Sequence, residues 1–215
     1  KYQDIYPKTS SATALIDIGF QPWGYAWMFP KAEVLSVGIV TPRSQAPKMK
    51  KRIQDYLEHL HIAEYPVDIA KGHKIRFRRN AEQIAKKRIA LIGDAAGLAD
   101  EFTQEGISYA IHSGKLIAKS LISGENTDPL KNYENAVDQY IQPELNAARL
   151  ISFMFQGMLH RFQKPWMFAT GHAPFLWKSF FEVQRGNSTY DKELKKAGPL
   201  GFVANKMLQR NSRYE

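Results

Sequence analysis

The sequence predicts a mixed α/β fold of the α+β kind, and three observations carry that prediction. Residues 13–40 hold apolar and aromatic segments of strand length, separated by Gly and Pro. Residues 88–92 form another short apolar segment, which runs into a Gly-Asp-Ala-Ala-Gly turn and then a helical pattern from Gly106. From Pro129 onward the pattern is helical. We therefore expect an antiparallel sheet, a strand-turn-helix unit and a helical C-terminal region.

The N-terminal part is predicted as an antiparallel meander. Its three expected strands are residues 13–20, 24–29 and 34–40. In the second strand, period-two alternation places Tyr25, Trp27 and Phe29 on one face. Ala26 and Met28 take the other face. One face of this strand is therefore an aromatic wall, which fits either ordinary sheet packing or the wall of a ligand pocket.

The next two elements are a helix and a strand. The helix is predicted over residues 48–61, with Ile53, Leu57 and Leu60 on one side. Residues 75–79 alternate between apolar and charged side chains and predict a strand.

The strand-turn-helix unit is expected to lie within a parallel sheet. Residues 88–92 have the continuous apolar pattern of a buried parallel strand. The helix over residues 106–122 carries an apolar stripe typical of a helix laid on a sheet, formed by Ile107, Ile111, Gly114, Ala118 and Leu121. Gly124 is the expected stop of this helix.

In the C-terminal region, Pro143 is expected to end or kink one helix, and the next helix runs from Glu144 to about Arg161. Residues 153–181 interleave aromatic side chains with Arg161, Lys164 and Lys178. Such a pattern fits a helix at a membrane interface, and it equally fits a helical cap whose aromatics pack inward. Both interpretations stay open at this point.

The turn at residues 93–97 has the chemistry of a polyol and phosphate site. Asp94 would emerge at the carboxyl end of a strand, where ligands of such sheets bind. Its carboxylate accepts hydrogen bonds from hydroxyls, and the neighbouring small residues allow close approach of a large flat ligand. The helix from Gly106 points N–H groups at an electron-rich group in front of it. The alternative is a plain turn in which Asp94 caps a backbone N–H.

This stretch closely resembles the second FAD fingerprint of the aromatic-hydroxylase-like flavoproteins, and among them the geranylgeranyl reductase family. The resemblance implies that Asp94 binds the ribityl and pyrophosphate side of FAD and that Gly106 and Ile107 face the flavin ring. The implied cofactor residues are Gly93, Asp94, Ala95, Ala96, Gly97, Glu105, Gly106 and Ile107. Glu101 and Gln104 depart from the family pattern, which has Pro and Gly there. A positive φ at Gln104 would cost about 1 kcal/mol.

A second segment, residues 24–31, resembles the Tyr-x-Trp-x-Phe-Pro signature of the same family. The signature ends in Gly-x-Gly, which here reads Gly38-Ile39-Val40. The resemblance implies that these residues line the pocket of a polyprenyl substrate. The implied substrate residues are Tyr25, Trp27, Phe29, Pro30 and Gly38.

Composition narrows the possible functions. The 215 residues are 44% hydrophobic and contain no Cys, which excludes disulfides and thiolate chemistry within this chain. The net charge is +9, yet Lys and Arg are spread along the chain and no nucleic-acid-binding module is visible, so no nucleic-acid partner is expected. His59 and His61 point about 200° apart on a helix, and no metal site is expected. No apolar stretch reaches the roughly 20 residues that span a bilayer.

We therefore expect an FAD-dependent oxidoreductase of geranylgeranyl reductase type, which reduces C=C bonds of a polyprenyl chain on a lipid or pigment precursor. NAD(P)H and ferredoxin are the candidate reductants. The chain contains no Gly-x-Gly-x-x-Gly motif for the ADP half of FAD, so a missing N-terminal FAD-binding half is the expected partner and the fragment alone is expected to be inactive. The expected location is cytoplasmic, with peripheral contact to a membrane.

The resemblance implies the C-terminal part of a two-domain FAD-binding oxidoreductase. Its expected parts are a substrate-domain sheet and helix (1–78), the closing strand and helix of the FAD domain (79–128) and a helical C-terminal region (129–215). Two other functions remain open: a flavin monooxygenase or halogenase of the same superfamily, and a non-catalytic lipid-binding remnant. The aromatic-Pro signature argues against the monooxygenase, and upstream coding sequence would test the remnant.

Overall fold

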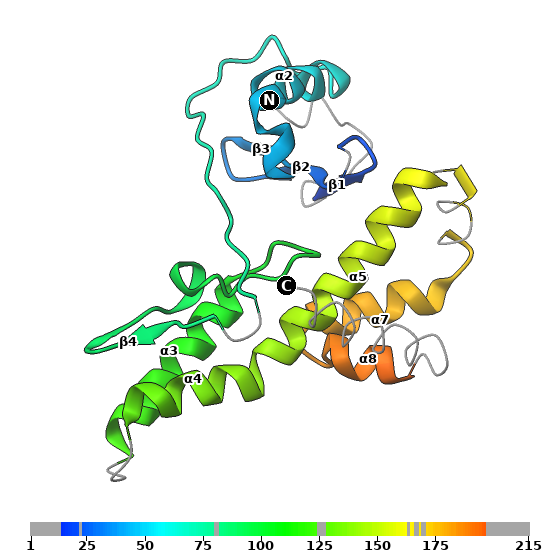
Figure 1. Cartoon of the computed structure of the whole chain (residues 1–215). Helices are drawn as coiled ribbons and strands as arrows, with labels where there is room; N and C mark the ends of the chain where they lie inside the picture. Colours follow the sequence, from blue (N-terminus) through cyan, green and yellow to red (C-terminus); the bar gives the residue numbers. More distant parts are fainter. Residues whose placement is uncertain are drawn as a thin grey trace. The chain divides into compact units, whose positions relative to one another are not determined.

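The computed structural model describes residues 14–21, 23–79, 82–123, 128–162, 164–165, 168 and 171–196. The chain divides into two compact units (Figure 1). The first unit comprises the described residues up to 72 and those among 155–169, and the second comprises those among 73–154 and from 170 onward. Each unit has a core of its own, so the mixed α/β composition predicted from the sequence is present. The three-part division into 1–78, 79–128 and 129–215 stays a prediction.

The first unit contains the expected antiparallel meander. Its strands are β1 (Leu15–Ile18), β2 (Tyr25–Pro30) and β3 (Leu35–Val40), in the order β1-β2-β3. In this register Trp27 lies opposite Ile16 on one side and Gly38 on the other. The strands form because β-branched and aromatic residues alternate between turn residues, as predicted.

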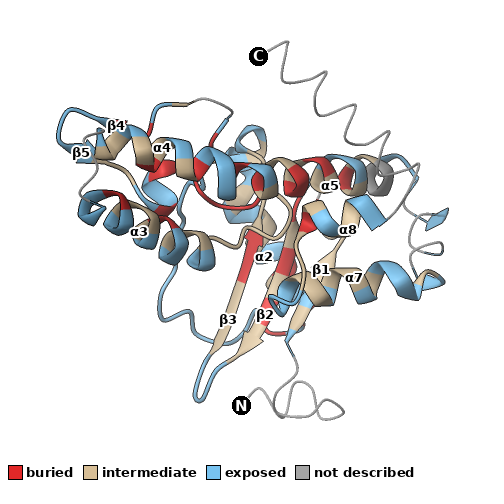
Figure 2. Ribbon diagram, turned by 90° about the horizontal axis from the view of Figure 1, so that it is seen from below, coloured by how far each residue is buried: buried red, intermediate tan, exposed pale blue. Residues whose placement is uncertain are grey.

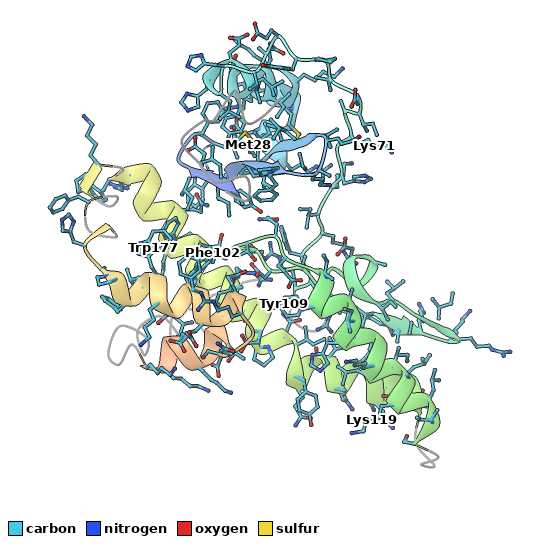
Figure 3. All side chains as sticks on the ribbon, turned by 180° about the vertical axis from the view of Figure 1, so that it is seen from behind. Met28, Lys71, Phe102, Tyr109, Lys119 and Trp177 are labelled. Carbon is cyan, nitrogen blue, oxygen red and sulfur yellow. The ribbon has the colours of Figure 1, made fainter. Side chains whose placement is uncertain are left out.

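A helix covers one face of this sheet. The 3-10 helix η1 (Arg43–Lys48) leads into α2 (Met49–His59). The predicted face of α2 packs inward, with Leu60 buried and Ile53 and Leu57 half-buried. Met28 lies in the core beneath α2 (Figure 3). The buried core of this unit consists of Ala26, Met28, Ile39, Tyr56, Leu60 and Ile62.

Two strand predictions in the second unit are wrong. Residues 75–79 form no strand; the Arg78 N–H donates to the Gly97 carbonyl at 2.8 Å, and the Arg79 carbonyl accepts the Glu82 N–H at 3.3 Å. The apolar run 88–92 is not a buried parallel strand either. It contributes β5 (Ile89–Ala90), which pairs antiparallel with β4 (Ala85–Lys86) in a two-residue hairpin. A parallel strand needs parallel neighbours, and within the described ranges β5 pairs only with the antiparallel β4, so Ile89 is 67% exposed.

The turn and the following helix form as expected, but the helix packs on a different side. The turn is the 3-10 helix η2 (Gly93–Ala96), and α3 (Ile107–Ile122) follows with Gly106 at its N-cap. The predicted stripe meets no sheet among the described residues, where Ile107 is 77% exposed and Ile111 and Leu121 are exposed too. The packed face lies beside it and consists of Tyr109, Ser113, Leu116, Ile117 and Ser120.

The rest of the second unit is helical, as predicted. Its helices are α4 (Pro129–Tyr140), α5 (Gln142–Arg161), α7 (Pro174–Gln184) and α8 (Tyr190–Lys196). Asp128 caps α4 through its bond from the Leu130 N–H. The break between α4 and α5 lies at Ile141, and Pro143 is in the first turn of α5, so the helix expected from Glu144 begins at Gln142. Buried residues gather along one side of α4 and of the first turns of α5 (Figure 2).

The buried Arg78 guanidinium connects several of these elements. The side chain is 1% exposed and donates to the Glu82 carbonyl, to Asp138 of α4 at 2.6 Å and to Gln142 of α5 at 2.6 Å. Its backbone N–H binds the carbonyl of Gly97. A Cβ on Gly97 would lie 2.7 Å from this backbone nitrogen, and Gly97 has a φ of 70°. Only glycine fits where the backbone of residue 97 lies against the backbone of Arg78.

We predict that Gly97→Ala lowers the free energy of unfolding by about 2 to 4 kcal/mol, because the new methyl group combines a left-handed backbone with a clash against backbone. Gly114→Ala in α3 is the matched control. Nothing lies within 4 Å of its added Cβ, and the change is expected to stabilise by about 0.5 to 1 kcal/mol. Urea unfolding followed by circular dichroism measures both; equal effects would contradict the close approach at Gly97.

Candidate functional site

The Gly-Asp-Ala-Ala-Gly turn packs tightly against α3. The N–H of Gly93 donates to the Ser113 hydroxyl at 3.1 Å, and a Cβ on Gly93 would lie 2.8 Å from the Cβ of Ala110. Gly93 also has a positive φ of 51°. The N–H of Leu98 closes the turn on the Gly93 carbonyl at 3.0 Å. The glycine is therefore required by both backbone conformation and helix packing.

Asp94 lies exposed on this turn. Its carboxylate accepts no hydrogen bond from the residues that the structure describes, so the alternative of a capping Asp94 is not observed there. The Oδ1 atom lies 2.9 Å from the position that a Cβ on Gly106 would take. The carboxylate thus adjoins the N-terminus of α3, across a residue that carries only hydrogen.

The N-terminus of α3 presents free backbone donors beside Asp94. Glu105 binds the Ser108 N–H at 2.7 Å and the Ser108 hydroxyl at 2.6 Å, which occupies one donor of the first turn. The N–H groups of Gly106 and Ile107 meet no acceptor within the described part of the chain. An acceptor carboxylate and two donors therefore lie next to each other.

A compact loop joins the turn to α3, and Asp100 organises it. Its Oδ1 accepts the N–H groups of Phe102 at 2.7 Å and Thr103 at 2.6 Å, and its Oδ2 accepts the Thr103 hydroxyl. The Asp100 N–H donates to the Glu105 carbonyl at 2.9 Å, and this bond joins the first residue of the loop to the last. Gln104 takes the positive φ that its position in the fingerprint implied, at 66°. The corresponding strain, about 1 kcal/mol, is therefore present in this loop.

The second departure from the family pattern, Glu101, has two arginine partners. Its Oε1 accepts Arg79 at 2.8 Å and Arg149 of α5 at 2.6 Å. Arg149 also donates to the backbone carbonyl of Arg78 at 2.8 Å. Glu101 thus ties the loop to α5 by charge-assisted hydrogen bonds, where a proline would stiffen the backbone instead.

The C-terminal helices hold the same loop from the other side. Phe102 lies beside the C-terminal helices (Figure 3). Its ring packs edge-on against Phe180 of α7 and Tyr190 of α8, with ring centroids 5.9 Å and 6.4 Å apart. The Tyr190 hydroxyl lies 3.3 Å from Oδ2 of Asp100, and the Tyr190 N–H donates to Glu144 at 2.8 Å. The sequence analysis missed these buried groups; the only local signal was Asp100 three residues before Thr103, which is typical of an Asx turn.

Burial sets the titration of this acidic cluster. It raises the pKa of the Asp100 carboxyl above its ordinary value, against the hydrogen bonds from Thr103, Phe102 and Tyr190 that lower it. Burial also raises the pKa of Glu144 and, together with the charge of Asp100, the pKa values of Tyr109 and Tyr190. Ionisation of Asp100 therefore lowers the stability of the folded chain.

The predicted substrate residues lie in the first unit, on the sheet face opposite its core. Tyr25, Trp27 and Phe29 form a half-buried row with ring centroids 6.1 Å and 6.2 Å apart. The indole of Trp27 covers Gly38, where an added Cβ would lie 2.1 Å from the ring. Pro30 ends β2 opposite Leu35. The structure thus gathers the predicted cofactor residues in the second unit and the predicted substrate residues in the first.

No cluster of three or more His, Asp or Glu side chains among the described residues is placed to hold a metal ion. Among the helices of the described ranges, none is long and apolar enough to cross a membrane.

We predict that wild type loses stability relative to Asp100→Asn as the pH rises from about 4 to 7. The folded-state pKa of Asp100 lies above its unfolded value, so its favourable contribution is complete below the unfolded pKa and is lost as the pH rises through the folded pKa. Urea midpoints across this range measure the difference. Asp68→Asn, an exposed acid in the first unit, is the control. A wild-type and Asp100→Asn difference that does not change with pH would contradict the prediction.

Comparison with known proteins found partial relatives. The chain is 36% identical over 107 residues to an uncharacterized protein of Methanosarcina barkeri, which covers 50% of this chain and 27% of that protein. It is 28% identical over 142 residues to digeranylgeranylglycerophospholipid reductase 2 of Methanococcoides burtonii (62% of this chain, 35% of the relative). It is 26% identical over 120 residues to the chloroplastic geranylgeranyl diphosphate reductase of Arabidopsis thaliana (55% and 25%).

No family model and no solved structure matches the chain. The matched regions span about a quarter to a third of the length of these curated relatives. The chain is therefore a distant and partial homologue of proteins named as geranylgeranyl reductases.

Proposed function

We propose that this chain forms the flavin-facing part of an FAD-dependent reductase that saturates C=C bonds of a polyprenyl chain on a lipid or pigment precursor. The observation that carries the proposal is that the exposed Asp94 carboxylate lies next to the free N–H groups of Gly106 and Ile107. The names of the distant relatives support the same substrate class and favour it over monooxygenase chemistry.

The residues present fit FAD. Asp94 is an acceptor for ribityl hydroxyls, and the Gly106 and Ile107 N–H groups are donors for a carbonyl edge of the flavin ring. The missing Cβ of Gly106 leaves room between them, since a methyl group there would press on Oδ1 of Asp94. When bound, reduced flavin supplies the hydride for the alkene, with NAD(P)H or ferredoxin as the source of electrons. The protein contributes binding and orientation.

The rest of the FAD site comes, in this proposal, from polypeptide outside these 215 residues. The chain has no Gly-x-Gly-x-x-Gly motif for the ADP half. The exposed stripe of α3 and the exposed Ile89 of β5 are the surfaces that such a segment would cover. Large aliphatic side chains in one stripe of a helix are typical of packing against a sheet.

The aromatic face of β2 is the proposed wall for the prenyl chain. Tyr25, Trp27 and Phe29 are half-buried on the side of the sheet that α2 does not cover. Such a row offers apolar contact and excludes water from an alkene, and it has no charged group to be desolvated. Gly38 extends this surface by letting the Trp27 indole lie flat on β3.

In the longer protein that the proposal requires, Asp94→Ala is predicted to weaken FAD binding by about 1.5 to 3 kcal/mol, the scale of a hydrogen bond to a charged group. Asp94→Asn keeps an acceptor oxygen and is expected to be milder. Asp68→Ala removes an exposed acid of the other unit and controls for net charge. Titration of FAD into the apo-proteins gives the affinities. Equal affinity of wild type and Asp94→Ala would refute a cofactor role for this carboxylate.

Trp27→Ala is predicted to leave FAD bound but to slow reoxidation of the reduced flavin by a geranylgeranyl lipid under anaerobic conditions by at least about ten-fold, because prenyl contacts are lost. Met28→Ala, on the buried face of the same strand, is the matched control. It should cost about 2 to 5 kcal/mol of stability through a cavity. Stopped-flow absorbance and urea unfolding separate the two effects. Unchanged reoxidation would show that Trp27 does not contact the substrate, and a loss of stability like that of Met28→Ala would indicate a packing role instead.

A further inference from the structure

Helix α7 has an inward face that fixes it to the second unit. Phe180 packs edge-on against Phe102 at a centroid distance of 5.9 Å, and Val183 packs with Tyr190 and the buried alanines of α5. The N–H of Arg185 continues the helix to the Phe181 carbonyl at 3.0 Å. The helix is therefore held by its own packing, and its opposite face is presented in a fixed orientation.

The opposite face of α7 combines exposed phenylalanines with cations. Pro174, Lys178, Phe181 and Arg185 follow at helical spacing on one stripe, and Phe175 lies beside it. Phe175 is 65% exposed and Phe181 is 50% exposed, and both cations are exposed as well. We call these five residues the α7 face. Exposure of two large aromatic side chains to water costs free energy, which a partner that covers them would remove.

The interleaved charges restrict what that partner is. Lys178 and Arg185 lie along this stripe, so a symmetric contact between two chains would bring cations of one copy near cations of the other, which a net charge of +9 disfavours further. At an anionic lipid surface the same arrangement is favourable. Phenylalanine rings enter the boundary of the acyl region, while Lys and Arg extend their stems and keep their charges at the phosphate level.

We propose that the α7 face docks this chain onto an anionic phospholipid membrane, with Phe175 and Phe181 inserted and Lys178 and Arg185 at the headgroups. This surface is separate from the turn and the aromatic row assigned above to cofactor and substrate. The proposal does not depend on reductase activity. If both hold, the membrane contact brings the enzyme to the phase in which polyprenyl lipids reside.

Flotation of the 215-residue chain with vesicles tests the proposal. We expect binding to phosphatidylcholine vesicles containing 30% phosphatidylserine, little binding to pure phosphatidylcholine, and weaker binding at high salt. Lys178→Gln and Arg185→Gln should each weaken binding about five-fold, the effect of one cation near such a surface. Phe175→Ser with Phe181→Ser should weaken it at least about ten-fold.

A matched control removes the same kinds of groups elsewhere. Val67→Ser, Ile69→Ser, Lys71→Gln and Lys74→Gln replace two exposed apolar residues and two exposed cations outside α7, and this variant should bind vesicles as wild type does. Circular dichroism verifies that every variant is folded. The proposal is overturned if wild type does not bind anionic vesicles, or if the control variant loses as much vesicle binding as the α7 variants. It is also overturned if sedimentation shows a concentration-dependent dimer that the α7 variants abolish while their vesicle binding persists.

Discussion

The buried guanidinium of Arg78 is the interaction on which the second unit depends. It joins a segment without regular structure to α4 and α5, and its backbone fixes the Gly97 turn. A buried cation is tolerable only when its donors are satisfied, and Arg78 meets acceptors with all three guanidinium nitrogens. Asp138 is half-exposed, so the Glu82 carbonyl and Gln142 carry much of this satisfaction inside the core. The position of the turn follows from this anchor.

Residues far away in the sequence fix the geometry of the candidate cofactor site. The loop between the turn and α3 is closed by Asp100, and Asp100 and Phe102 are in turn held by Tyr190 of α8. Glu101 binds Arg149 in α5. The strained Gln104 is thus surrounded on both sides by fixed neighbours, which is the condition under which a loop retains an unfavourable φ. The helical C-terminal region is therefore part of the framework of the site.

Local patterns predicted part of this structure. The meander, α2 and the Gly-Asp-Ala-Ala-Gly turn follow from alternation, helical periodicity and glycine chemistry, which act within a few residues. The sequence predictions that failed are those that depend on which distant residues an element packs against. Residues 88–92 have a strand pattern but gain only the two-residue β4, and the α3 stripe has no cover among the described residues. Burial of Arg78 and Asp100 was not predictable, because charged residues enter a core only where distant groups satisfy them.

Two exposed apolar surfaces of the second unit differ in a way that separates their proposed roles. The α3 stripe runs through Ile107, Ile111 and Leu121 and contains only aliphatic residues and glycine. The α7 face places Lys178 between its two phenylalanines and Arg185 one turn beyond Phe181. A purely aliphatic stripe suits a protein interior, where a cation would be desolvated at a large cost. An aromatic surface with cations suits an interface between apolar chains and phosphate groups. Charge pattern, more than exposed area, therefore distinguishes a surface for polypeptide from a surface for lipid.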